Sequence, residues 1–499
     1  MHRVLRLLVM LAPLTACSTL SNTARSYLTA PDGLQIDDER VRALLQRGMP
    51  DSALRAVSNR TSALSPDDRL LRLLYQGTAA RYAGREREAG GFFDQAFAVS
   101  EDRFTKSISR TAEALVTNDY ALPYTAGQNE RLLLHCNALL AWSAHGDADA
   151  ASVEARRLVA LLASFGEPDA DERPMRAMMH ALASAVFEQS GDWNDADVAR
   201  RNAIRLGAGL DSAWRAPSDA FGDVVVLIER GDVAHKVAVG LSVPIFAGED
   251  VSASDGRFAA ERMLADFGAM RNGGLWWDDT PSWRFAGTRY GAYRGARASY
   301  LLDMSWPVLR RSWSNGRGSV QIVSEDNTLG ASVLGASVSD AIASDYRRDR
   351  GAIMTRTIAR AVTKYVAAKA IEAAAESAAR KSSAEKDSKK KRKRDDDAAR
   401  ATGLMARLFV NATTTMLERA DTRAWTLLPA TLSMVRLRLP AGTHELLVDA
   451  SGTRQLSLPN VVVRGGRTTV LSVRLWREVG EGIRAVVERS ATDQASPHR

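Results

Sequence analysis

Hydrophobic and polar positions follow two different patterns along the chain, and the change falls near residue 220. From residue 36 to 210, Ala, Leu and Arg dominate and β-branched runs are few, which favours helices. The pattern then changes to an apolar, β-branched run over residues 224–228 that ends at Gly231. Such a run predicts a buried strand followed by a turn. We therefore expect a helical first half and a β-containing second half.

The helical region contains four glycines that are each followed by an alanine five residues later. Glycine suits a tight turn between two helices, and alanine lets the second helix approach the first. The pairs are Gly48 and Ala53, Gly84 and Ala89, Gly146 and Ala151, and Gly191 and Ala196. Together with Gly77 and Phe93 around the second turn, they resemble degenerate tetratricopeptide repeats, with inserted loops near residues 122–124 and 167–169.

Stacked helix pairs usually present a concave surface that binds a peptide or another protein. We expect that use here, although the pattern does not identify the binding residues. The alternative is that the helices only pack against the second half of the chain and leave no groove.

The second half begins with strands and then returns to helix. Apolar runs at 237–245, 300–307 and 319–323 predict further strands. From 338 to 380 an apolar face recurs every three or four residues, which predicts a long helix. A second helix at about 398–419 would return along it as a hairpin, with a charged, flexible insertion at 381–397 between the two.

The C-terminal region has short alternating strands separated by glycine turns. The predicted strands are 432–439, 443–449, 454–463 and 468–475. This spacing predicts a small antiparallel sheet or half-sandwich. The turn at Pro440 and Gly442, with the closing strand 470–475, resembles the small β module called the PEGA domain, whose members bind or act as spacers.

The sequence thus predicts an α+β multidomain protein with a tetratricopeptide-like α-solenoid, a mixed β domain with a helical hairpin, and a small C-terminal sheet. The expected segments are a signal peptide (1–16), a lipid-anchored linker (17–35), helical repeats (36–210), a mixed β domain (220–430), a small β module (431–476) and a polar tail (477–499).

The first twenty residues predict where the protein works. Arg3 and Arg6 precede a short apolar run, which is typical of an export signal and too short for a membrane span. The run ends in Leu14-Thr15-Ala16-Cys17, which resembles the lipobox of bacterial lipoproteins, and the resemblance implies acylation of Cys17 with chains such as palmitate. Ser18 after the cysteine implies the outer membrane and its periplasmic face, rather than the inner membrane. Cys136, the other cysteine, lies in an apolar stretch and is expected to be buried.

The chain carries a formal net charge of +8, and the strongest basic run is the six residues 389–394. Aspartates follow this run directly, and it contains no aromatic residue that could stack on a base. An exported protein does not usually meet nucleic acid, so we expect no nucleic-acid partner. A solvated hairpin is the leading interpretation, and adhesion to anionic lipid or lipopolysaccharide is the alternative.

Half of the ten tryptophans fall within residues 276–313. Exposed rings such as Trp276, Trp277 and Trp283 could stack on sugars, which predicts an alternative function in binding or cleaving peptidoglycan or another polysaccharide. The other interpretation, which we prefer, is that the rings of this cluster, Trp306 and Trp313 among them, fill the space between sheet and loops.

Familiar catalytic patterns are absent from the sequence. It contains no nucleophile elbow, phosphate loop, dinucleotide fingerprint or zinc-binding His-Glu-x-x-His. His135, His145 and His180 lack a second ligand at helical spacing, and Asp278-Asp279 is an ordinary acidic pair. We therefore expect no enzyme activity, no cofactor and no bound metal. Asp421, Arg423 and Trp425 are predicted to form a structural knot around an Arg–carboxylate pair.

Several of these pieces together resemble one family. The lipobox, the helical repeats, the strand ending at Gly231, the helix carrying Arg356 and Arg360, and the stretch 421–430 are similar to a group of uncharacterised bacterial envelope lipoproteins. That family has no assigned activity to carry over. The sequence predicts a non-enzymatic, lipid-anchored periplasmic scaffold that binds another envelope protein through its helical repeats and contacts the membrane through Cys17.

Overall fold

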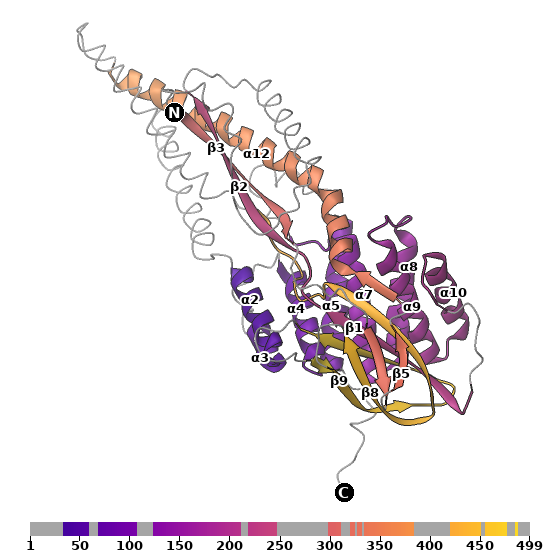
Figure 1. Ribbon diagram of the computed structural model, residues 1–499. Helices are drawn as coiled ribbons and strands as arrows, with labels where there is room; N and C mark the ends of the chain where they lie inside the picture. The colour runs from indigo at the N-terminus through magenta and orange to yellow at the C-terminus, as the bar shows by residue number, and fades with distance from the viewer. Residues whose placement is uncertain are drawn as a thin grey trace, which may run out of the picture.

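A computed structural model describes eleven stretches of the chain. They are residues 33–58, 68–106, 123–210, 218–246, 298–310, 320–324, 327–331, 334–383, 420–450, 455–476 and 485–487. The protein is an α+β molecule with a run of paired helices, followed by mixed and antiparallel sheets and one long helix (Figure 1).

The paired helices agree with the turns predicted from the sequence. They are α2 (Gly33–Gln46), α3 (Pro50–Ser58), α4 (Arg69–Tyr82), α5 (Glu86–Lys106), α7 (Gln128–His145), α8 (Ala148–Ser164), α9 (Arg173–Ser190) and α10 (Trp193–Arg205). The four turn glycines have φ of 68°, 69°, 87° and 88°, in the left-handed region that glycine adopts readily. The four alanines that follow them are all fully buried. The local prediction of helix pairs is therefore confirmed.

The second half forms three sheets. The strands are β1 (Phe221–Arg230), β2 (His235–Phe246), β3 (Ala298–Arg310), β4 (Val320–Ser324), β5 (Asn327–Ala331), β6 (Leu334–Ser337), β7 (Thr431–Pro440), β8 (Gly442–Ala450), β9 (Leu456–Val463), β10 (Thr468–Leu475) and β11 (Ala485–Val487). A five-stranded mixed sheet has the order β11-β10-β1-β7-β6, and a four-stranded antiparallel sheet has the order β5-β4-β8-β9. β2 and β3 pair with each other.

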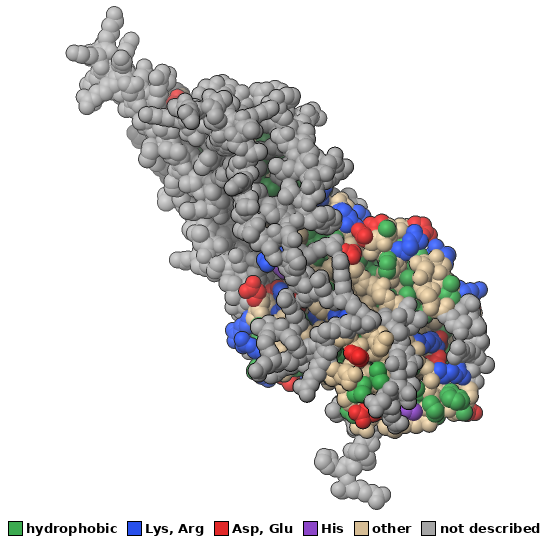
Figure 2. Space-filling view, in the orientation of Figure 1, with side chains coloured by type: hydrophobic (Ala, Val, Ile, Leu, Met, Phe, Trp, Pro, Cys, Tyr) green, Lys and Arg blue, Asp and Glu red, His purple; other side chains and the backbone are tan. Residues whose placement is uncertain are grey.

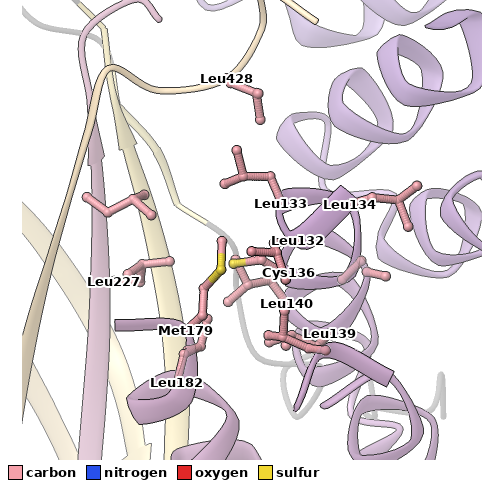
Figure 3. Packing of buried hydrophobic residues seen from close by; sticks show 14 of the residues in the cluster. Leu132, Leu133, Leu134, Cys136, Leu139, Leu140, Met179, Leu182, Leu227 and Leu428 are labelled. Carbon is pink, nitrogen blue, oxygen red and sulfur yellow. The ribbon is translucent and has the colours of Figure 1, made fainter. Parts of the chain in front are cut away.

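Strand β1 lies in the middle of the body, and both of its faces are buried. Val224, Val226 and Ile228 pack against the four-stranded sheet, whereas Val225 and Leu227 pack against the helices. Figure 3 shows Leu227 facing Cys136 of α7 and Met179 of α9. The continuous apolar run of β1 follows from this burial on two sides. Cys136 is buried, as the sequence predicts.

The C-terminal strands do not form a sheet of their own, so that prediction is wrong. β7 pairs antiparallel with β1, and β10 pairs parallel with β1 on its other side. β8 and β9 join β4 and β5 in the second sheet. Alternation along a strand indicates which face is buried but not which strand lies beside it, because any strand with matching faces can pair.

Strands β2 and β3 extend away from the body together with α12 (Val338–Ser383), and we call these three elements the arm (Figure 1). Met304 and Trp306 of β3 pack against Met354 and Ile358 of α12. The prediction of a long helix from 338 is confirmed. The helix continues through 383, into the start of the predicted insertion, and the remainder of that insertion and the helix expected at 398–419 lie outside the described residues. Among the described helices, none is long and apolar enough to cross a bilayer.

Candidate functional site

The inner face of the helical run is covered by the chain's own sheet. We use "inner face" for the sides of α4, α7 and α9 that are turned toward the five-stranded sheet. These three helices are buried along most of their length, and α7 and α9 pack against β10. Their apolar residues belong to one cluster with the sheet residues Leu227 and Val470. This is the surface that would form a groove in an open array of helix pairs, and here protein fills it.

The segment 420–430, which we call the clasp, attaches the helices to the start of β7. Trp425 is 1% exposed, and its ring lies 6.2 Å from that of Phe93 on α5. Its Nε1 donates to Thr78 Oγ1 on α4 at 3.0 Å. Because Trp425 buries a large ring and also satisfies its N–H group, it fixes the clasp against the α4–α5 helix pair.

A buried arginine at the beginning of the clasp joins two carboxylates. Arg423 contacts Asp421 at 2.8 Å and Asp68, immediately before α4, at 2.7 Å. Burial opposes charging of Arg423, but both carboxylates raise the pKa of its guanidinium. The predicted Arg–carboxylate pair with Asp421 is confirmed. The partner 355 residues away, Asp68, was not predicted because local sequence carries no signal for it.

Two buried carboxylates, Glu229 and Glu188, also hold the inner face to the sheet. Arg81 and Tyr82 at the end of α4 both bind the carboxylate of Glu229 on β1, and the Tyr82 hydroxyl donates at 2.8 Å. Farther along the sheet, Glu188 of α9 accepts two bonds from Arg436 of β7 at 2.6 and 3.2 Å. Such charge-assisted, bidentate contacts fix orientation as well as distance. The helices are therefore held rigidly on the sheet.

The arm is attached to the body through α12. Asp345 on α12 accepts the backbone N–H of Asn129, near the start of α7, at 2.9 Å, and also accepts the Asn129 side chain at 3.0 Å. Gly127 precedes α7, and a Cβ there would lie 2.5 Å from the Asp345 carboxylate. Burial raises the pKa of Asp345 to about 7.

The outer face of the helical run is the part that stays open. We use "outer face" for α5, α8 and α10, the second helices of three pairs, and Figure 1 shows α10 on the side of α9 away from the strands. Arg157 of α8 contacts Asp94 of α5, and Arg156 contacts Asp195 of α10 at 3.2 Å. Basic and acidic side chains are interspersed over the described surface in Figure 2. Val153 on α8 and Val198 on α10 are 44% and 40% exposed.

Several predicted site residues lie outside the described residues. These are Cys17, Trp276, Trp277, Trp283 and the pair Asp278-Asp279. Trp306, from the same tryptophan-rich segment, is 5% exposed and packs in the arm, as the core interpretation expects for that ring.

The histidines of the helical run have different surroundings. His135 is buried and lies 2.8 Å from Glu154 of α8, and His145 is half-buried. Burial lowers the pKa of His180 to about 4, so that ring is neutral at pH 7. The described residues contain no group of three or more side chains placed to hold a metal ion.

Comparisons with known proteins give little guidance. No family model and no curated protein matches the chain. Among solved structures, it is similar to the crystal structure of BtubC (BKLC) from P. vanneervenii, with 16% sequence identity over 40% of this chain and 93% of that chain. The TM-score is 0.16, which is too low to establish a shared fold.

Proposed function

We propose that this protein is a lipid-anchored periplasmic scaffold of the bacterial outer membrane, without enzymatic activity, that binds another envelope protein. In this proposal the helix pairs are degenerate tetratricopeptide-like repeats, and Cys17 carries the lipid. The contact between Gly77 and the Phe93 ring supports the repeat assignment, because a small residue facing an aromatic one is the pattern of such repeats.

The outer face carries the proposed binding function. The inner face is already occupied by the sheet, so a partner has to bind elsewhere on the helical run. The outer face offers three helices joined by ion pairs, with exposed aliphatic side chains among charged ones. An apolar centre surrounded by polar residues is the usual composition of a protein interface.

The experiment compares matched surface variants in detergent-solubilised envelopes. Val153→Glu combined with Val198→Glu places charge on the outer face, and Ile371→Glu on α12 is the control because Ile371 is similarly exposed, at 43%. We expect the outer-face variant to reduce co-purification of one specific partner at least about tenfold, since burying one valine contributes about 1.5 kcal/mol or more. The control variant should retain that partner.

Two outcomes would contradict the proposal. Loss of the partner only in the Ile371→Glu variant would assign binding to the arm. Co-sedimentation with peptidoglycan that is abolished by Trp276→Ala and Trp277→Ala would assign a glycan-binding function instead. Deleting residues 36–210 is an unsuitable control, because those helices supply one side of the core that buries β1.

A further inference from the structure

Arg474 of β10 is a buried arginine that contacts no carboxylate among the described residues. It is 1% exposed. Its Nη2 donates to the backbone carbonyl of Gly231 at 2.7 Å, whereas its Nε and Nη1 have no hydrogen-bond acceptor in the protein. The buried arginines Arg423 and Arg176, by contrast, each contact a carboxylate. Because moving a charge from water into the core costs free energy, Arg474 requires an anion that the described side chains around it do not provide.

The carboxylate opposite Arg474 in the sheet is already bound. Glu229 of β1 lies across from Arg474 in the parallel pairing of β1 and β10. Its Oε1 accepts a hydrogen bond from Arg81, and its Oε2 accepts one from the Tyr82 hydroxyl at 2.8 Å. Glu229 therefore compensates the charge of Arg81, and the charge of Arg474 has no counterion in the described part of the chain.

Trp476 places another N–H donor beside Arg474. The two residues are two positions apart, and the guanidinium carbon of Arg474 lies 3.9 Å from the centroid of the Trp476 ring. Trp476 is 2% exposed, and its Nε1 also has no acceptor in the protein. The Tyr82 ring packs edge-on against Trp476 at 5.6 Å. Since a buried tryptophan N–H group usually has a partner, the donors of both residues indicate a shared acceptor.

The donors and their surroundings define the class of that acceptor. Three N–H groups and one positive charge favour an anion, and a monovalent anion leaves no net charge. Trp476 belongs to the apolar cluster between the helices and the sheet, where a charge pair is weakly screened. Because both residues are almost completely enclosed, a small inorganic ion fits the site better than an organic acid.

We propose that Arg474 and Trp476 bind a monovalent inorganic anion of the size of chloride between the helices and the sheet. The ion accepts hydrogen bonds from Nε and Nη1 of Arg474 and from Nε1 of Trp476. It is the counterion of Arg474 and stabilises the body. This inference does not depend on the proposed scaffold function, because the anion site and the outer face use different residues.

The test is thermal unfolding of the detergent-solubilised full-length protein in sodium chloride, sodium bromide and sodium gluconate at equal ionic strength. Gluconate is too large for an enclosed site, so it serves as the control for screening by salt. An ion that binds only the folded state raises the melting temperature. We expect chloride and bromide to raise it by about 2 °C or more relative to gluconate. Anomalous scattering from bromide-soaked crystals should then locate one ion beside Arg474 and Trp476.

Variants separate this site from general effects of salt. Trp476→Phe keeps an aromatic ring and removes one donor, so it should fold and bind chloride about tenfold more weakly. Arg474→Met should abolish the difference between chloride and gluconate, and Arg85→Met, which alters an exposed arginine, should retain it.

Three results would overturn the proposal. They are equal melting temperatures in chloride, bromide and gluconate, an unchanged response to chloride in folded Trp476→Phe, and bromide located only at other sites. If Arg474→Met does not fold, Trp476→Phe and the bromide position still decide the question.

Discussion

Replacing Arg423 with methionine should destabilise the whole body, because it leaves a buried carboxylate without its cation. The Arg423 side chain is 2% exposed and that of Asp68 is 3% exposed, so water cannot replace the lost contact. Removing one partner of a buried ion pair costs about 3–5 kcal/mol. Asp421, at 22% exposure, keeps some access to water and adds less.

The assay is urea denaturation at pH 7, followed by far-ultraviolet circular dichroism for the helices and by tryptophan fluorescence for the tertiary packing of the chain's ten tryptophans. Both signals should shift together, since Arg423 joins the helical run to the sheet. Adding Asp68→Asn to Arg423→Met should restore part of the lost stability, because no unpaired charge is then buried at that position.

The matched control is Arg85→Met, which removes the same side chain from an exposed pair with Asp51. Exposed pairs contribute little, so we expect no measurable loss of stability. Equal losses in the Arg85 and Arg423 variants, or a shift in only one of the two signals, would refute the reasoning about the clasp.

Three further predictions address other parts of the molecule. Gly77→Ala should lower the free energy of unfolding, measured from urea midpoints, by about 1–3 kcal/mol, because the new Cβ would lie 2.6 Å from the Phe93 ring. Gly91→Ala on α5, where an added Cβ meets no atom within 4 Å, should leave the free energy of unfolding unchanged or raise it. Burial raises the pKa of Asp345 from 3.8 to about 7, so the folded state binds this proton more tightly than the unfolded state. The contribution of Asp345 to the free energy of unfolding should therefore increase as pH falls from 7 toward 4. In the Asp345→Asn variant, the urea midpoint should change less between pH 5 and pH 8 than in the unaltered protein. The same pH dependence in both proteins would contradict this prediction. Cys17→Ala should move the protein from the membrane fraction to the soluble periplasmic fraction and abolish palmitate labelling, and retention at the membrane would contradict the predicted anchor.

Local features of the sequence predicted the helix pairs and most strands. The turn glycines and the alanines after them act within a few residues, so their pattern is readable without knowledge of the fold. The unbroken apolar run of β1 likewise indicated a buried strand, and the structure shows that both of its faces are buried. Short strands were missed where their residues are weak strand formers, as in Leu334–Ser337, with its glycine, alanine and serine.

Contacts between distant segments were not predictable in the same way. Asp421 and Arg423 are two residues apart, and their pairing follows from proximity, whereas Asp68 reaches the same guanidinium only through the fold. The outer face could be identified only after the structure placed the sheet on the other side of the helices.

The position of β1 has a consequence for how the chain folds. Val225 lies opposite Arg436 of β7 on one side and Val470 of β10 on the other, so both neighbours come from the last part of the chain. The helices that cover β1 come from the first part. Pairings with such high contact order form slowly, because a long loop has to close before any contact compensates for the lost entropy. The body therefore completes its folding only after nearly the whole chain has been delivered, and a nascent chain stopped before β7 would expose its most apolar strand to proteases and chaperones.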